Sequence, residues 1–447
     1  MSADVQEVGP GEEGGEASLH QLAGGGGTQL EEQLERAAPT HLFIFANPGS
    51  GSRKARRFTA MEFESVILKS QRAWVHIVDL TQPDAVQRGF AEMRKLQASS
   101  GPLDPPLKFI ICGGDGTFMR CLLDCMKAGV DVNRNLHVRP LPPSLPPSSP
   151  LSLTVQSCLL PFGTGNDFAR VSGWGGALSS SSLKSIQRLT KEILSCVVQH
   201  VNIWEITVYL REGGSLQIVG ADRRNQEIAR VSLKKLMVNY FSVGVDAQIG
   251  LEFDRRRTKS KCCNNCVYGC QGLKKCCCGC NTSLKRVIDY MAREGAEAGD
   301  SRVLFASDHG TDADQYLRGK PVSLICTNID SYMGGRANPW AKRKKKTGLE
   351  SADGTTILND FSGVQRYDDG LLEFCAIYSV FGMATQQFIR VAQAEGPFVL
   401  KFRDTPGLET FLNIDGEYFR LLQPDRLVVK LCSALQDGRL KALMRQK

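Results

Sequence analysis

The stretch Phe109–Ile–Ile–Cys–Gly–Gly–Asp–Gly–Thr117 decides the fold, because in it an apolar run passes directly into a glycine-rich turn. A short apolar run that ends in turn residues is typical of a strand buried on both faces. The apolar residues that follow recur at spacings of three and four, which predicts a helix; they are Phe118, Cys121, Leu122, Cys125 and Met126. The stretch therefore predicts a strand, a turn and a helix in immediate succession.

The same succession occurs twice more in the first half of the chain. The apolar run His41 to Ala46 leads into Asn47–Pro–Gly–Ser–Gly51, and Val155 to Leu160 leads into Pro161–Phe–Gly–Thr–Gly–Asn–Asp167. A further strand is expected from Trp74 to Leu80. This alternation predicts an α/β domain built on a parallel sheet with helices on both faces.

The length of 447 residues is too great for one ordinary core, so we expect two domains. From about residue 199 the stretches alternate apolar and polar side chains, which predicts a β-rich, mainly antiparallel second domain. The expected organisation is a disordered N-terminal tail at 1–39, a nucleotide-binding catalytic domain at 40–198 with a Pro/Ser-rich insertion at 138–152, an accessory domain at 199–435 with a Cys-rich insertion at 255–285 and a basic loop at 341–350, and a C-terminal tail at 436–447.

The three glycine-rich turns predict a phosphate site. A turn of this kind between a strand and a helix exposes backbone N–H groups at the positive end of the helix dipole. In a parallel sheet the three turns would converge on the carboxyl edge, where open α/β sheets bind ligands. The sequence has no Gly-x-x-x-x-Gly-Lys-Ser/Thr loop, no complete dinucleotide fingerprint and no Gly-x-Ser-x-Gly elbow, which excludes the common nucleotide-hydrolase, dinucleotide and serine-hydrolase interpretations.

Acidic side chains within these turns indicate a bound cation. Asp115 lies in the second turn, and Asn166 and Asp167 end the third. A carboxylate among phosphate-binding groups is unfavourable unless a cation bridges the charges, and Mg²⁺ binds through one or two carboxylates plus substrate phosphates. No structural requirement explains a carboxylate between three glycines, so we interpret Asp115 as functional. Backbone donors, a metal and an acid that orients the attacking oxygen are what phosphoryl transfer requires.

Beyond these turns the sequence resembles the diacylglycerol kinase family, within the larger group that includes sphingosine and ceramide kinases. The motifs that carry the resemblance follow the family's order and are Phe109–Thr117, Leu160–Arg170, Asn239–Ile249, Asn328–Gly335, Asp368–Glu373 and Ile414–Glu417. The third glycine-rich turn is closer to the diacylglycerol branch than to the sphingosine branch. The resemblance covers about residues 40–430 and implies a nucleotide-binding domain packed on a β-rich accessory domain, with the active site between them.

Carried over position by position, the resemblance implies roles for individual residues. Asp115 would hold the metal network and the transferring group, Asp167 would share that network, and Asp246 would be a further Mg²⁺ ligand, partly through water. The nucleotide would be contacted by Asn47, Gly49, Ser50, Gly51, Gly113, Gly114, Gly116, Thr117, Gly163, Thr164, Gly165 and Asn166.

The resemblance assigns the lipid hydroxyl to a second group of acids. Asp369 would orient or deprotonate it, with Asp368 as a near rival and Glu373 as a possible helper. Each also has a structural interpretation: Asp246 and Asp368 can be turn residues bonded to their own backbone, and Asp369 precedes a glycine, itself a turn signal. Asp415–Gly416 has the same pattern, and there we expect a plain hairpin.

Eight cysteines between Cys262 and Cys280 depart from the family's pattern. Cys263, Cys266, Cys277 and Cys280 could ligate one Zn²⁺, although the adjacent cysteines fit a zinc ribbon poorly. S-acylation of a membrane-facing loop and a disordered insertion are the alternatives. The basic runs at 255–257 and 342–346 are consistent with solvated loops or with contacts to anionic phospholipid, and 342–346 also with a nuclear signal.

We therefore expect an ATP-dependent lipid kinase that transfers the γ-phosphate of Mg·ATP to 1,2-diacylglycerol, giving phosphatidate as a signalling lipid. The alternatives are a kinase for ceramide, sphingosine or monoacylglycerol, and a catalytically silent membrane adaptor. With no apolar run of about 18 residues and no signal peptide, we expect reduced cysteines and a cytoplasmic protein attached peripherally to membranes. Nucleic acid is not an expected partner.

Overall fold

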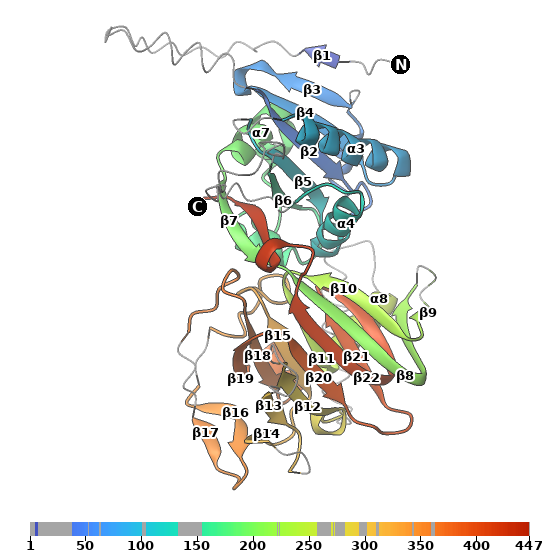
Figure 1. Ribbon diagram of the computed structural model, residues 1–447, viewed down its shortest axis with the longest axis vertical. Helices are drawn as coiled ribbons and strands as arrows, with labels where there is room; N and C mark the ends of the chain where they lie inside the picture. The colour runs from blue at the N-terminus through green and yellow to red at the C-terminus, as the bar shows by residue number, and fades with distance from the viewer. Residues whose placement is uncertain are drawn as a thin grey trace, which may run out of the picture.

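The computed structural model describes two stacked β-sheet domains (Figure 1). Within the described residues the first sheet has eight strands and the second has fifteen. The described residues are 5–7, 38–51, 53–61, 64–100, 104–132, 154–220, 222, 224–256, 270, 272, 282–294, 302–309, 313–341, 344–358 and 363–446. The Pro/Ser-rich insertion, most of the Cys-rich insertion and the zinc ligands proposed above, Cys263, Cys266, Cys277 and Cys280, lie outside them.

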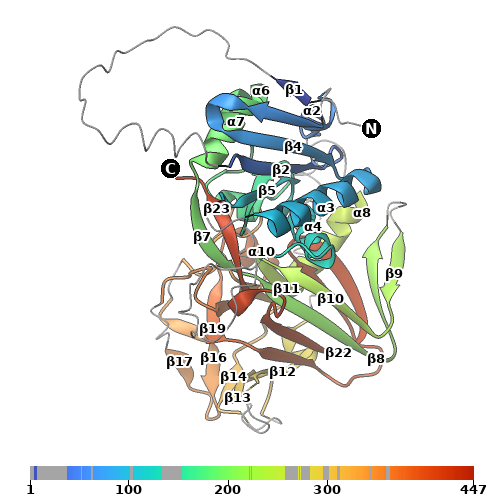
Figure 2. The same cartoon turned by 45° about the horizontal axis from the view of Figure 1, so that its top comes forward.

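The first sheet is the α/β domain that the alternation of strands and helices predicts. Its strand order is β1-β3-β4-β2-β5-β6-β23-β7, and β4, β2, β5 and β6 run parallel. Helices α3 and α4 lie on one side of the sheet, and α6 and α7 lie on the other (Figure 2). The bounds are β1 Val5–Glu7, β2 Thr40–Ala46, α2 Arg56–Thr59, β3 Ser65–Leu68, β4 Ala73–Asp79, α3 Pro83–Ser99, β5 Leu107–Gly113, α4 Asp115–Lys127, β6 Val155–Pro161, α5 Asp167–Val171, α6 Ser180–Lys184, α7 Ile186–Leu194, β7 Val197–Asn202 and β23 Arg439–Met444.

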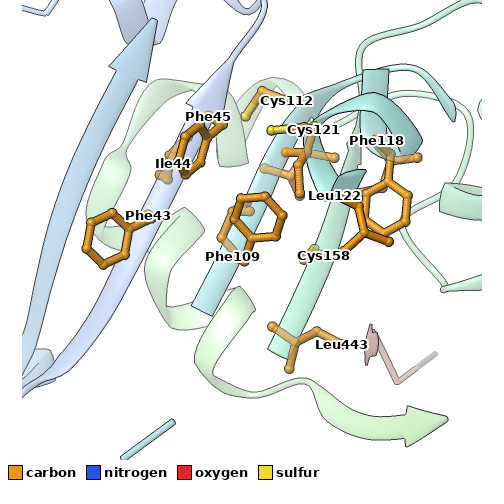
Figure 3. Packing of buried hydrophobic residues seen from close by; sticks show 14 of the residues in the cluster. Phe43, Ile44, Phe45, Phe109, Cys112, Phe118, Cys121, Leu122, Cys158 and Leu443 are labelled. Carbon is orange, nitrogen blue, oxygen red and sulfur yellow. The ribbon is translucent and has the colours of Figure 1, made fainter. Parts of the chain in front are cut away.

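Large apolar side chains from the central strands and from α4 form the core of this domain (Figure 3). The ring of Phe45 stacks on Phe90 of α3 at 4.9 Å and meets Phe109 edge-on at 5.1 Å. Phe118 and Leu122 of α4 are fully buried, so the helical stripe predicted from the sequence is the face that packs on the sheet. This packing fixes the ends of β2, β5 and β6, from which the glycine-rich turns emerge.

The C-terminal residues form part of this sheet, although we expected a tail at 436–447. Strand β23 lies between β6 and β7, with Ala442 paired to Ser157 and Leu440 paired to Val201. The apolar residues of Leu440 to Met444 are buried there. Residues 199–202, which we assigned to the accessory domain, belong to β7 of the same sheet, and Val5–Glu7 pairs with β3 within the expected N-terminal tail. The chain thus leaves the first sheet at Asn202 and returns to it at Arg439.

The second sheet is almost wholly antiparallel, as the alternating sequence predicts, and is built around the long strands β8 and β22. Helix α8 packs against β11, β21 and β22. The bounds are β8 Trp204–Val219, β9 Asn225–Ala229, β10 Ser232–Met237, β11 Tyr240–Gly244, α8 Val245–Arg256, β12 Ile288–Arg293, β13 Arg302–Ala306, β14 Gln315–Leu317, β15 Ser323–Thr327, β16 Lys346–Ser351, β17 Thr356–Leu358, β18 Leu371–Ile377, α10 Val380–Ala384, β19 Ile389–Glu395, β20 Phe398–Phe402, β21 Glu409–Ile414 and β22 Glu417–Leu431.

Candidate active site

A cavity of about 510 Å³ lies between the two domains, where the three glycine-rich turns meet. The accessory domain closes it with acids and aromatic rings, among them Asp246, Asp415, Glu417, Tyr240 and Tyr332. The predicted site residues that line it are Ser50, Gly51, Gly114, Asp115, Gly116, Thr117, Gly163, Thr164, Gly165, Asp167 and Asp246. Asn47, Gly49, Gly113 and Asn166 do not line the cavity. They lie immediately beside the lining residues in the same turns.

The three turns touch one another backbone to backbone. A Cβ atom at Gly163 would lie 2.4 Å from the Cα atom of Gly114, and one at Gly51 would lie 2.1 Å from the carbonyl oxygen of Phe162. Both separations are shorter than real Cβ contacts, so only glycine fits at these two positions. Asn166 closes the third turn by donating from Nδ2 to the carbonyl oxygen of Gly163 at 3.0 Å. The turns therefore present a continuous wall of backbone to the cavity.

Asp115 joins the second turn to the third. Its two carboxylate oxygens accept hydrogen bonds from the backbone N–H groups of Asp167 and Phe168, at 3.0 and 3.1 Å. This contact is a structural requirement for a carboxylate at this position, which the sequence did not reveal. Burial, followed by the charge of Asp167, raises the pKa of Asp115 to about 7. The free site therefore binds a proton readily, and a cation in the cavity would favour the ionised form.

Asp167 joins the catalytic domain to the accessory domain. Its Oδ1 accepts from the Ser331 hydroxyl at 2.5 Å and from the Gly335 N–H at 2.9 Å. Its Oδ2 accepts from the Gly334 N–H at 2.9 Å and from the Tyr240 hydroxyl at 3.4 Å. Both oxygens are therefore engaged by the accessory domain, and the side chain clamps the 331–335 turn onto the glycine-rich turns.

Asp246 has one carboxylate oxygen available. Its Oδ2 accepts from the Tyr332 hydroxyl at 2.9 Å and from the Ser242 hydroxyl. Its Oδ1 is buried and makes no hydrogen bond to the described residues, while the Ser323 hydroxyl and the Ala247 N–H lie close enough to the carboxyl group to lower its pKa. Burial raises the pKa of this carboxyl group. A buried carboxylate oxygen without a donor, at the wall of a cavity, is a suitable position for a metal ligand.

The donor set fits Mg²⁺ carried with a nucleotide better than a metal bound by the protein alone. No group of three or more His, Cys, Asp or Glu side chains that could hold a metal occurs in the part of the chain that the structure describes. Mg²⁺ usually keeps several waters and takes one or two carboxylates plus phosphate oxygens. Asp246, with Asp115 close to the same cavity, meets that requirement.

Asp415 is a site residue that the sequence did not identify as one. It forms the expected two-residue hairpin with Gly416, with φ angles of 48° and 83°. Its carboxylate, however, lines the cavity and accepts from the backbone N–H groups of Val238, Asn239 and Tyr240 at 2.8 to 3.0 Å. Burial raises its pKa to about 8. The motif Ile414–Glu417 could have indicated a site residue here, but we interpreted Asp415 only as part of a hairpin.

Arg170 is a second residue that the sequence analysis left without a role. It lines the cavity and donates from Nε to the carbonyl oxygen of Gly165 at 3.2 Å. A Cβ atom at Gly176 or Gly335 would lie 2.2 or 2.7 Å from this side chain, so both glycines leave room for it. Arg170 and Arg336 are the cationic side chains among the described lining residues, which otherwise carry several carboxylates.

The structure does not bring Asp368, Asp369 and Glu373 to the wall of the cavity. Asp368 pairs with both Nε and Nη2 of Arg366 at 3.0 Å, and the Asp369 Oδ1 accepts from the Leu371 N–H at 3.0 Å. Glu373 is fully buried, where it accepts from the amides of Gln365 and Gln393, and burial raises its pKa to about 8. These acids form a separate group, which we call the acid turn (residues 367–373).

Two domain families match the chain in the order expected. The family described as "Diacylglycerol kinase catalytic domain" matches residues 41–198, and the one described as "Diacylglycerol kinase accessory domain" matches residues 236–418. Together they span about three quarters of the chain. The cavity lies where residues of both matched regions meet.

Individual relatives carry the same name at modest identity. The eye-specific diacylglycerol kinase of Drosophila melanogaster is 26% identical over 91% of this chain and 22% of its own length. Diacylglycerol kinase theta of Homo sapiens is 26% identical over 84% of this chain and 32% of its own length. Diacylglycerol kinase 4 of Arabidopsis thaliana is 23% identical over 84% of this chain and 76% of its own length. The chain thus spans about a third or less of the fly and human relatives.

The two matched regions cover the residues that build the cavity, and the relatives align across most of the chain. The chain therefore belongs to the diacylglycerol kinase family.

Proposed function

We propose that this protein transfers the γ-phosphate of Mg·ATP to the free hydroxyl of 1,2-diacylglycerol, giving phosphatidate. The observation that carries the proposal is the meeting of three glycine-rich turns with Asp115 and Asp246 at one cavity. The turns supply the backbone donors that phosphates need. The carboxylates supply oxygen ligands for a divalent cation. The family membership supports a lipid acceptor.

The residues of the cavity divide the work of such a transfer. The turns would hold the phosphates, with Thr117 close to the Asn47 amide at their junction. Mg²⁺, held by Asp246 and the nucleotide with Asp115 near it, would neutralise charge on the phosphates. Arg170, fixed against Gly165, would place a guanidinium beside the transferring group.

The transfer forms one bond and breaks one bond. The acceptor oxygen bonds to the γ-phosphorus, the bond from that phosphorus to the bridging oxygen breaks, and ADP leaves. The acceptor's proton passes to a carboxylate or to solvent. We propose Asp369 for orienting the hydroxyl, with Asp368 as rival and Glu373 as helper. Because one hydroxyl oxygen must meet both Asp369 and the γ-phosphorus, the acceptor hydroxyl would lie at the boundary between the acid turn and the cavity.

We further propose peripheral attachment to an anionic membrane surface, where a diacylglycerol acceptor is found. No helix in the described part of the chain is long and apolar enough to cross a bilayer. Exposed cationic and apolar side chains occur on the accessory domain, including Lys344 to Lys346, Val364 at 82% exposure and Phe381 at 63%. Such a mixture suits contact with anionic headgroups and the outer acyl region.

The test is transfer of labelled γ-phosphate from Mg·ATP to mixed micelles containing diacylglycerol, ceramide, sphingosine or monoacylglycerol. We expect labelled phosphatidate that is lost in Asp115→Asn and kept in Asp124→Asn. Asp124 is the matched control because it lies on the outer face of the same helix, paired with Arg120. Label on another lipid would retain the kinase and change the substrate. Nucleotide binding without label on any lipid would overturn the proposal in favour of a silent membrane adaptor.

A further inference from the structure

Three buried asparagines lie between the cavity and the acid turn. Asn202, Asn239 and Asn328 are each 1% exposed or less. Asn202 ends the last strand of the catalytic sheet before the chain crosses to the accessory domain, Asn239 precedes β11, and Asn328 follows β15. We call these three residues the asparagine ladder. Burying an amide is costly unless it is hydrogen-bonded, so their shared location needs a physical reason.

Asn239 forms the end of the ladder that meets the cavity. Its side-chain amide lies close enough to the Asp115 carboxylate to lower the pKa of that group. Its backbone N–H donates to Asp415 Oδ1 at 2.9 Å, and its carbonyl oxygen accepts from the Asn328 N–H at 2.8 Å. Asn239 therefore lies against two of the cavity acids, Asp115 and Asp415, and bonds directly to the next member of the ladder.

Asn328 is the fully bonded centre of the ladder. Its Nδ2 donates to the carbonyl oxygens of Val238 at 2.7 Å and Asn202 at 3.0 Å. Its Oδ1 accepts from the indole N–H of Trp204 at 2.9 Å. Through these bonds and its backbone bond to Asn239, Asn328 connects residues 238–239, just before β11, to Asn202, where the chain leaves the first sheet.

Asn202 forms the end of the ladder that meets the acid turn. Its Oδ1 accepts from the Gly370 N–H at 2.9 Å, and its backbone N–H donates to the Tyr367 carbonyl oxygen at 2.6 Å. These two bonds bracket Asp368 and Asp369 from both sides. The Asn202 Nδ2 has no partner among the described residues. Within those residues, the side chain of Asn202 therefore bonds to the acid turn alone, through Gly370.

We propose that the asparagine ladder is a positioning device that holds the acid turn at a fixed place relative to Asp115. The proposal rests on the proposed function, since it assigns the acid turn to the acceptor. Hydrogen bonds are directional, so they fix this geometry more closely than apolar packing alone would. Because the amides are neutral, they do so without adding charge between two groups of acids. Phosphoryl transfer depends steeply on such alignment, because a misplacement of about 1 Å can cost on the order of 10² in rate.

The test removes the last bond of the ladder. Asn202→Ala should lower kcat for lipid phosphorylation by about 10-fold or more, with the Kd for nucleotide within about twofold of the unmodified protein. Asn225→Ala is the matched control. Asn225 lies on the exposed strand β9, away from the acid turn, and accepts a hydrogen bond from Arg255 of α8. Asn202→Ser keeps a neutral oxygen that can accept from Gly370 and should recover more of the rate than Asn202→Ala does. This variant also keeps the test valid if the alanine variant does not fold.

A double variant separates positioning from general stability. In an Asp369→Asn background, Asn202→Ala should cost nothing further, because the group it positions is already lost. An additive loss there, or an equal loss of nucleotide affinity, would overturn the proposal.

Amide hydrogen exchange gives a readout that needs no enzyme activity. Asn202→Ala should speed exchange across residues 367–371 and leave residues 163–168 unchanged. Failure of the lipid kinase assay with this exchange pattern would reject the proposed function and keep the ladder. Unchanged exchange at 367–371 would reject the ladder itself.

Discussion

Asp115 and Asp415 of the cavity are held in a different way from Asp368 and Glu373 of the acid turn. Asp115 accepts from two backbone N–H groups, and Asp415 accepts from three. Asp368 and Glu373 are held by the side chains of Arg366, Gln365 and Gln393. Backbone donors fix a carboxylate as part of the fold, whereas side-chain partners can rotate away. The comparison indicates a rigid half of the site for phosphates and metal, and an adjustable half for the acceptor.

The largest effect should come from the rigid half. Asp115→Asn should lower turnover by about 10² to 10³. The amide lacks the charge that a cation needs, and its NH₂ group would face an N–H donor of Asp167 or Phe168. Turnover, nucleotide Kd and thermal unfolding should be measured together against Asp124→Asn. Turnover within tenfold of the unmodified protein would place the essential carboxylate elsewhere.

A large effect on stability is expected at the clamp between the domains. In Asp167→Asn the amide NH₂ would replace one oxygen that now accepts from Gly334 or Gly335. A buried donor left unsatisfied costs about 1–3 kcal/mol, and the lost charge adds to this. Urea unfolding should therefore show a lower midpoint. An unchanged midpoint, with Asp124→Asn as reference, would show that the clamp adds little to the domain contact.

The adjustable half should separate its two neighbouring aspartates. Asp369→Asn should lower kcat by roughly 10² with nucleotide Kd unchanged. The reason is that Asp369 accepts through Oδ1 from its neighbour Leu371 and would present its other oxygen to an acceptor. Asp368→Asn should change kcat by less than about threefold, because exposed ion pairs such as Asp368 with Arg366 contribute little. The reverse order would assign the acceptor to Asp368. Unaltered rates in both variants would remove the acid turn from the mechanism.

The contrast between the two halves also explains what the sequence could predict. The three glycine-rich turns were predicted to converge because parallel strands end at one edge of a sheet, and the order of β2, β5 and β6 fulfils this. Strand and helix positions around Phe109 and Phe118 followed from periodicity. A β-rich second domain was likewise predicted from alternation. Local pattern was sufficient wherever geometry is fixed by neighbours along the chain.

The missed features all depend on partners that are distant in sequence. Asp167 bonds Gly334 and Gly335, and Asp415 bonds Val238 to Tyr240, more than 150 residues away in each case. No local spacing encodes such pairs, because strand order in an antiparallel sheet is not written in any one segment. Strand β23 left a signal in the apolar residues from Leu440 to Met444. Its position at the end of the chain led us to expect a tail.

The smallest expected effect is a change of stability with pH that comes from Glu373, the buried acid of the adjustable half. Burial raises the pKa of Glu373 to about 8, above the value near 4.3 expected for an unfolded glutamate. The neutral form therefore stabilises the fold below about pH 4, and this contribution is lost as the pH rises through about 8. Glu373→Gln stays neutral at every pH. Its oxygen can accept from one of the two glutamine amides, and the other partner can turn its own oxygen toward the new NH₂ group.

Thermal unfolding without metal should show this crossover directly. Between pH 6 and pH 9 the Tm of the unmodified protein should fall relative to Glu373→Gln by on the order of 2–4 °C. Asp353→Asn is a control for a fully exposed acid, which should show no such relative shift over this range. Parallel Tm curves for the unmodified protein and Glu373→Gln would mean that Glu373 is already ionised in the fold. The amides of Gln365 and Gln393 would then hold a buried charge, and burial would not be the dominant influence on this acid.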